Sequence, residues 1–196
     1  MKIKSLALAA SLFAFGSAVA VAAPTTYTVD PDHAQIHFTY SHMGFSNITG
    51  TINVSDGTVT YDPEKPASSS VEITADMNTI NVAVQAMNDH LKADDFFEVA
   101  KYPTASFKST RVEAAGENAL KLTGDLTIRD VTLPVSFDVT VNKLGEHPMR
   151  KVPAAGFDAS GTIQRPDFGV TTYTMVTGPE VRLNISFEAF APAASE

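Results

Sequence analysis

Residues 120–141 alternate apolar and polar side chains so regularly that this segment constrains the fold more than any other part of the chain. The apolar residues occupy even positions up to Ile128 and odd positions from Val131 onward. A two-residue loop between these two residues places them opposite one another, so both strands keep their apolar side chains on one face of the sheet. The segment therefore predicts an antiparallel β-hairpin with a single apolar face.

The same alternation recurs along the rest of the chain, with few segments that favour a helix. The further alternating runs are 36–40, 48–54, 59–61, 71–75, 157–163 and 181–187. Many antiparallel strands with one apolar face leave two all-β folds, a two-sheet sandwich or a sheet closed into a barrel. A sandwich fills its own core, whereas a barrel of about eight strands can hold one small ligand.

Residues 82–97 interrupt the β pattern. Apolar residues recur at helical spacing from Val84 to Leu91, and Asn81 is a candidate N-cap for a helix that starts there. We therefore predict a short helix near residues 82–97. An amphipathic helix of this kind can close one end of a barrel, and such a helix can also line the opening through which a ligand enters.

The first 22 residues have the pattern of a cleavable export signal. Lys2 and Lys4 precede an apolar run over residues 6–21, and small residues at alternate positions fit cleavage after Ala22. The run is short for a transmembrane helix, which needs about 20 apolar residues. We expect residues 1–22 to be removed during export.

Composition limits the partners and the stabilising chemistry of the mature chain. The full chain has a formal net charge of −8, and losing two lysines makes it more negative. An acidic surface disfavours nucleic acid, so we expect no nucleic-acid partner and only a local, transient, apolar contact with membranes.

Cysteine is absent, so the fold rests on its core rather than on disulfides. We expect one domain over residues 23–190 and a flexible tail over residues 191–196.

The titratable residues offer an alternative function. Asp89 and His90 are neighbours, but the sequence has no GxSxG motif, catalytic cysteine or Walker loop that would give them a nucleophile or a phosphate site. We interpret them as a local hydrogen-bonded pair at the helix end, and we expect no enzymatic activity and no cofactor. The alternative is a small-molecule or metal-dependent enzyme that uses Asp89, His90 and Arg165.

Three histidines, His33, His37 and His42, fall within ten residues and suggest a metal site. On an extended strand, however, His33 and His37 lie roughly 13 Å apart at about 3.3 Å per residue. They cannot share one ion without a sharp bend, so we expect no metal site.

Four separated motifs resemble the YceI-like family of bacterial periplasmic proteins. They are DPDHAQIHFTYSHMGFS at 30–46, DHLKADDFFEVAKYP at 89–103, GDLTIRDVTLPV at 124–135 and RPDFG at 165–169. The motifs follow the family's order over almost the whole mature chain. Two residues depart from the family pattern, since Ala34 stands where Ser is common and Asp130 stands where Gly is common. Asp tolerates a positive φ, so we expect the second change to be harmless.

The resemblance implies a lipocalin-like antiparallel barrel in the periplasm. It also implies that the barrel binds polyisoprenoid lipids, such as isoprenoid quinones or polyprenyl compounds, in an apolar channel, often as a homodimer. We therefore expect a periplasmic carrier for polyisoprenoid lipids.

Candidate ligand contacts follow from this interpretation. The predicted residues of the barrel interior, each of which could also be plain core, are Phe38, Tyr40, Ile73, Leu122, Leu126, Ile128, Val135, Phe137, Val139, Ile163, Leu183, Ile185 and Phe187. The candidates at the mouth of the barrel are His42, His90, Phe96, Phe97 and Arg165. Arg165 could face a pyrophosphate or quinone oxygen there, or it could form an ion pair with Asp167.

Overall fold

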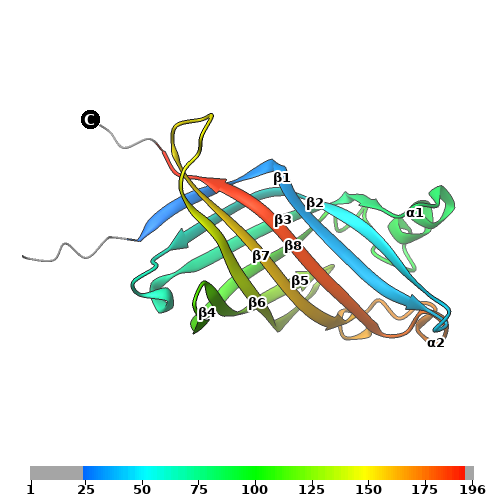
Figure 1. Ribbon diagram of the computed structural model, residues 1–196. Helices are drawn as coiled ribbons and strands as arrows, with labels where there is room; N and C mark the ends of the chain where they lie inside the picture. The colour runs from blue at the N-terminus through cyan, green and yellow to red at the C-terminus, as the bar shows by residue number, and fades with distance from the viewer. Residues whose placement is uncertain (1–23, 193–196) are drawn as a thin grey trace, which may run out of the picture.

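A computed structural model describes residues 24–192, which form a closed barrel of eight antiparallel strands (Figure 1). The strands are β1 (Thr25–His42), β2 (Ser46–Tyr61), β3 (Ser70–Asn81), β4 (Thr104–Gly116), β5 (Ala119–Ile128), β6 (Val131–Glu146), β7 (Pro153–Gln164) and β8 (Glu180–Phe190). Each strand pairs with its neighbours in the chain, and β1 pairs with β8 to close the barrel. The predicted barrel is therefore confirmed, and the sandwich is excluded.

The hairpin predicted between residues 120 and 141 has the expected register. Ile128 pairs with Val131, and the intervening residues form the two-residue turn. The positive φ of this turn falls on Arg129, at 58°, and not on Asp130 as expected. The left-handed conformation lies at the first turn position, which Arg129 occupies. The departure from the family at Asp130 therefore falls on a residue without a positive φ.

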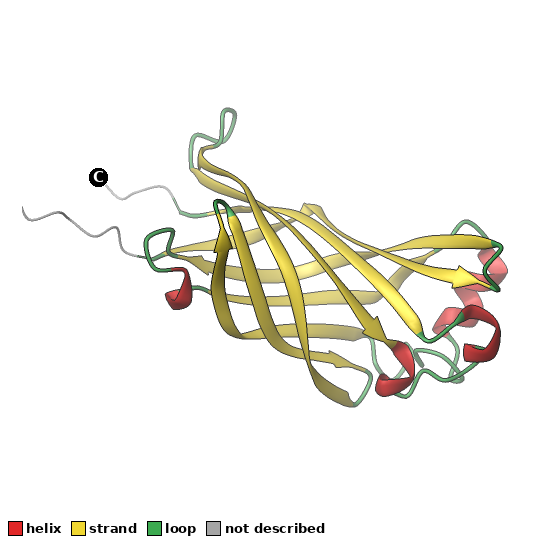
Figure 2. Cartoon of the chain, turned by 60° about the horizontal axis from the view of Figure 1, so that its bottom comes forward, coloured by secondary structure: helices red, strands yellow, loops and turns green. Residues whose placement is uncertain are grey.

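The two ends of the barrel differ in the helical segments that they carry. They are η1 (Pro66–Ser68), α1 (Gln85–Lys92), η2 (Arg165–Phe168) and α2 (Thr174–Thr177). Figure 2 shows helices gathered at one end of the barrel, where α1, η2 and α2 connect the strands. We call this the helical end, and we call the opposite end, which carries η1, the η1 end. No helix within residues 24–192 is long and apolar enough to cross a membrane.

Helix α1 begins later than the sequence predicts. Asn81 is the last residue of β3 and pairs with Thr51, so it cannot cap a helix. Instead, Asn88 within α1 bonds back to the preceding segment. Its side chain accepts a hydrogen bond from the Val82 N–H at 2.6 Å and donates one to Asn81 Oδ1 at 2.8 Å. These two bonds fix α1 across the helical end.

The C-terminal boundary of the packed chain lies beyond residue 190. Ala191 is buried, and its N–H donates a hydrogen bond to the Pro153 carbonyl at 2.9 Å. The predicted tail therefore begins at least one residue too early. Residues 193–196, like the predicted signal peptide at 1–22, lie outside the described residues.

The barrel interior is densely packed at the η1 end. Tyr61 lies edge-on to Phe157 at 5.8 Å, and Phe157 lies against Phe187 at 5.4 Å. Phe38, Ile80 and Leu91 belong to a second, smaller cluster at the helical end, to which α1 contributes Leu91. The space between these two clusters holds the candidate functional site.

Candidate functional site

A cavity of about 350 Å³ lies inside the barrel and extends to the helical end. This volume lies within the range of small-molecule sites, about 300–1,000 Å³. Every strand contributes to its lining, together with α1 and the loop that follows η2. Val181, Leu183 and Ile185 of β8 point inward but are only half-buried. They pack against the core on one side and line the cavity on the other, which explains this partial exposure.

Most of the residues predicted in the barrel interior line this cavity. They are Phe38, Tyr40, Ile73, Leu122, Leu126, Ile128, Phe137, Ile163, Leu183, Ile185 and Phe187. Val135 and Val139 do not line it. Both lie on the inward face of β6, but Val139 is buried in the main core and Val135 packs against that core. Alternation identifies the inward face of a strand but not the depth to which the barrel is filled.

Two aromatic rings of the cavity lining pack against each other. Phe107 and Phe137 line the cavity and pack edge-to-face with ring centroids 5.3 Å apart. Each ring lies over a glycine of a neighbouring strand, Gly124 of β5 for Phe107 and Gly161 of β7 for Phe137. A Cβ atom at Gly124 would lie 2.5 Å from Phe107 Cζ, and one at Gly161 would lie 2.7 Å from Phe137 Cδ1. Because glycine has no side chain, these two positions leave the space that the rings occupy.

All five predicted mouth residues line the cavity, but their pairing differs from the prediction. His90 Nε2 donates a hydrogen bond to Asp95 Oδ2 at 2.9 Å, and Asp89 accepts one from Gln85. The predicted pair of Asp89 and His90 is therefore wrong, because adjacent residues of a helix do not face each other. The His90 ring packs edge-on against Phe96 at 4.9 Å. The arrangement fixes His90 as part of the wall at the mouth.

Arg165 is the principal polar group of the cavity lining, and its side chain is buried. Nε donates a hydrogen bond to the Gly178 carbonyl at 3.1 Å. Nη1 donates to the carbonyls of Val170 at 3.2 Å and Thr172 at 2.7 Å. Nη2 donates to the Thr177 hydroxyl at 2.8 Å. These bonds attach the loop 170–178 to the end of β7.

The charge of Arg165 has no acidic partner among residues 24–192, so the predicted ion pair with Asp167 is not formed. Burial lowers the pKa of Arg165, although an arginine stays charged in proteins. Burial raises the pKa of Tyr40 nearby, and the positive charge of Arg165 opposes that rise. A guanidinium has five N–H groups. The four hydrogen bonds to the described residues therefore use four of these five donors.

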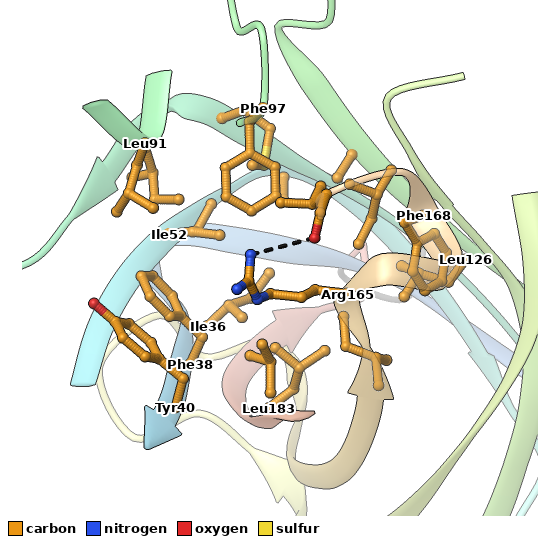
Figure 3. Close-up of a pocket in the computed structure, with 18 of the residues that line it drawn as sticks. Ile36, Phe38, Tyr40, Ile52, Leu91, Phe97, Leu126, Arg165, Phe168 and Leu183 are labelled. Atoms are coloured by element: carbon orange, nitrogen blue, oxygen red, sulfur yellow. Dashed lines mark hydrogen bonds between the residues drawn. The ribbon is translucent and has the colours of Figure 1, made fainter. Parts of the chain in front are cut away.

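Figure 3 shows the Arg165 side chain extending into the cavity among apolar residues that include Phe97 and Ile36. A buried cation in apolar surroundings attracts an anionic or strongly polar oxygen, because little solvent competes for it. The rest of the lining is almost wholly apolar. The site can therefore hold an apolar chain and one polar group at the helical end.

Arg129 is a second structural arginine that the sequence analysis missed. From the β5–β6 turn, its Nη1 donates to the Phe96 carbonyl at 3.1 Å, and its Nη2 donates to Glu98 Oε2 at 3.1 Å. It also bonds the Gly169 carbonyl at 3.4 Å. Arg129 thus joins the segment after α1 to the segment after η2. Its place in a turn at the helical end was the only sequence signal for this role.

Several apolar lining residues were also missed by the sequence analysis. They are Met77, Ile80, Met87, Leu91, Phe168, Val170, Tyr173 and Val176. Most of them lie in α1 or in the segments that cross the helical end, where no alternating pattern marks the inward side. Only the assembled barrel places them around the cavity.

The three histidines considered as metal ligands lie apart. His33 is at the η1 end, where its Nδ1 donates to Asp30 Oδ2 at 2.9 Å, and His42 lines the cavity at the helical end. His37 lies between them on β1. The hydrogen bond raises the pKa of His33 and lowers that of Asp30. Within residues 24–192 no cluster of three or more His, Asp or Glu side chains could hold a metal ion.

Comparison with known proteins places this barrel in a family. The model of the YceI-like domain matches residues 27–189. The chain belongs to the YceI-like family. The resemblance carried by the four sequence motifs is thereby confirmed. Among curated members, a UPF0312 protein of Enterobacter sp. strain 638 is 37% identical over 189 residues, which cover 95% of each chain. Protein YceI of Salmonella arizonae is 37% identical over 92% of this chain and 93% of its own length.

Solved structures of YceI-like proteins share the fold. The crystal structure of Burkholderia cenocepacia BcnA superposes with a TM-score of 0.73 at 28% identity, covering 82% of this chain and 99% of that one. A Campylobacter jejuni YceI protein superposes with a TM-score of 0.66 at 29% identity, covering 78% of this chain and 90% of the other. The barrel described above is thus the fold of YceI-like proteins.

Proposed function

We propose that this YceI-like protein is a periplasmic binding and carrier protein for polyisoprenoid lipids. The observation that supports this best is the cavity itself, an apolar space inside the barrel whose helical end carries one buried cation without an acidic partner. The isoprenoid tail fills the apolar part, and a polar head group lies near Arg165. An isoprenoid quinone or a polyprenyl phosphate has both parts.

Burial of the tail supplies most of the affinity. About ten CH₂ groups at ~0.8 kcal/mol each contribute about 8 kcal/mol, which corresponds to micromolar binding from water. Strongly bound water does not oppose this step, because the lining presents few polar groups. A longer tail binds more tightly until the cavity is full.

The head group is recognised at Arg165. The guanidinium is held by the loop 170–178, so it does not lose side-chain freedom when a ligand binds. Its remaining N–H donates to one ligand oxygen. A phosphate or a quinone carbonyl satisfies this donor, whereas a hydrocarbon without a head group leaves it unbonded.

The protein acts without catalysis in this proposal. His90 is engaged by Asp95, and Asp89 is engaged by Gln85, so these residues serve the structure of the helical end. The hydroxyl of Thr172 lies beside the His90–Asp95 pair, but it donates its hydrogen bond to the Asp95 carbonyl. The cavity holds its ligand and releases it unchanged.

The test is a titration of the mature protein with ligands that share one quinone head group and differ in the number of isoprene units. We expect affinity to rise with each unit and then to level off. Mass spectrometry of lipids extracted from the native protein identifies the ligand. The proposal is wrong if head-group analogues without tails bind as tightly as the long-chain ligands.

A further inference from the structure

Two loops at the helical end expose large apolar side chains. Met43 and Phe45 lie in the β1–β2 turn, and Tyr173, Met175 and Val176 lie in and next to α2. Phe45 is 90% exposed and Met175 is 99% exposed. We call these five residues the rim. Exposed apolar groups of this size that gather in one place mark an interaction surface.

The rim is one connected surface that continues into the cavity. The Met43 N–H donates a hydrogen bond to the Val176 carbonyl at 2.9 Å, which joins the two loops. Figure 1 shows the β1–β2 turn beside α2. Tyr173 and Val176 are both exposed and part of the cavity lining. Apolar surface therefore extends from the outside of the protein to the interior of the barrel.

The loops that carry the rim are uncharged, although the chain is strongly acidic. Residues 41–48 and 169–179 contain no Asp, Glu, Lys or Arg, whereas the whole chain has a net charge of −8. Their polar residues other than His42 are Ser, Thr, Asn and Tyr, which can form hydrogen bonds with lipid head groups. An uncharged loop enters a bilayer surface without the cost of removing water from an ion.

The β1–β2 turn holds an apolar residue, Met43, in a left-handed conformation. Met43 has a φ of 54° and Gly44 a φ of 75°, and the Phe45 N–H bonds the His42 carbonyl at 3.0 Å. A turn with a positive φ at both central residues favours Asn or Gly at the Met43 position. Methionine is a costly residue in a left-handed conformation, which is a feature of functional loops.

We propose that the rim docks on a lipid bilayer, with Phe45 and Met175 inserted into the boundary between head groups and acyl chains. In this position the cavity opens toward the acyl phase, and an apolar tail enters it without crossing water. The loading role rests on the proposed function, whereas docking itself does not. The rim favours a bilayer because both of its loops lack charged residues in an otherwise acidic chain, and because its apolar surface continues into the cavity.

The absence of tryptophan from the chain permits a direct test. Phe45→Trp and Met175→Trp each introduce a single fluorophore at the rim. Met149→Trp is the matched control, because Met149 is 85% exposed but lies in the β6–β7 hairpin at the η1 end. With phosphatidylcholine vesicles that contain no isoprenoid, we expect a blue shift and quenching by brominated acyl chains for the rim variants only. Anionic lipid should not strengthen binding, since the rim has no cationic cluster.

The second measurement removes the apolar groups. Phe45→Ser with Met175→Ser should lower the vesicle partition coefficient by about tenfold for each side chain, while Met149→Ser leaves it unchanged. These residues are exposed, so the variants should keep the wild-type melting temperature. Docking is wrong if the rim tryptophans do not respond to vesicles or if the double variant partitions like the wild type. It is also wrong if the double variant changes only the oligomeric state, which would assign the rim to contact between copies.

The test of docking and the test of the proposed function can fail independently. Loss of vesicle binding together with a normal tail-length series would reject docking and retain the carrier. Vesicle binding without any isoprenoid affinity would reject the carrier and retain docking.

Discussion

Substituting phenylalanine for two alanines of β7 tests whether the barrel holds a cavity that binds a tail. Ala155 and Ala159 both point inward, because they are four residues apart on a strand without a register shift against β8. Ala159 lines the cavity and is half-buried. Ala155 is 2% exposed and lies in the packed η1 end. The same substitution therefore meets space at one position and packed side chains at the other.

The two variants should separate stability from binding. Overpacking at Ala155 should lower the free energy of unfolding by about 1–3 kcal/mol or more, whereas Ala159→Phe should change it by less than about 1 kcal/mol. In Ala159→Phe, the new ring occupies the space of about one isoprene unit. At ~0.8 kcal/mol for each of about five carbons, up to about 4 kcal/mol of tail burial is lost, or roughly a thousandfold in affinity.

Urea unfolding followed by circular dichroism measures the first effect, and ligand titration with the tail-length series measures the second. In Ala159→Phe, affinity should level off about one isoprene unit earlier than in the wild type. Folded Ala155→Phe should keep the wild-type length dependence. Equal destabilisation of both variants would show that Ala159 also lies in packed core. An unchanged length dependence in Ala159→Phe would show that the tail does not occupy this cavity.

Three further predictions concern other parts of the molecule. Replacing Arg165 with Met should lower stability by about 1–3 kcal/mol for each loop carbonyl left without a donor, and should abolish the preference for ligands with a polar head, as urea unfolding and titration measure. The hydrogen bond to Asp30 raises the pKa of His33, so its stabilisation is complete below about pH 6.5 and is lost as the pH rises through the raised pKa. The melting temperature of the wild type should therefore exceed that of His33→Ala by more at pH 5.5 than at pH 8.5, and equal differences would contradict the assignment. N-terminal sequencing of the periplasmic protein should begin at or near Ala23, whereas a cytoplasmic protein that keeps Met1 would refute export.

The sequence predicted the wall of the barrel because the alternation of apolar and polar residues identifies the two faces of each strand. The register of the Ile128–Val131 hairpin follows from the same pattern, since a shift by one residue would expose every apolar side chain. The position along the barrel at which packing gives way to the cavity does not follow from it. That position depends on contacts between different strands, such as those of the rings that lie over Gly124 and Gly161.

The polar contacts at the helical end were harder to predict because they form between loops. Arg165 bonds carbonyls of the loop 170–178, and carbonyls carry no sequence signal. His90 pairs with Asp95 instead of its neighbour Asp89, because a turn after α1 brings Asp95 back to it. Sequence proximity was a reasonable guide to residues near the mouth and a poor guide to which of them bond.

In the proposed carrier function, the energetics of exchange with a membrane give Arg165 a role that tail length cannot supply. A tail in a bilayer is already in apolar surroundings, so its transfer into the cavity is close to balanced. The tail therefore sets affinity measured from water but does not set the direction of exchange with a membrane. A head group gains a hydrogen bond to a charged donor at Arg165, and bonds of this kind contribute about 1.5–3 kcal/mol, or roughly ten- to a hundredfold. A bias of this size favours loading at a donor membrane and still permits release, so Arg165→Met should shift the partition of a lipid between protein and vesicles toward the vesicles.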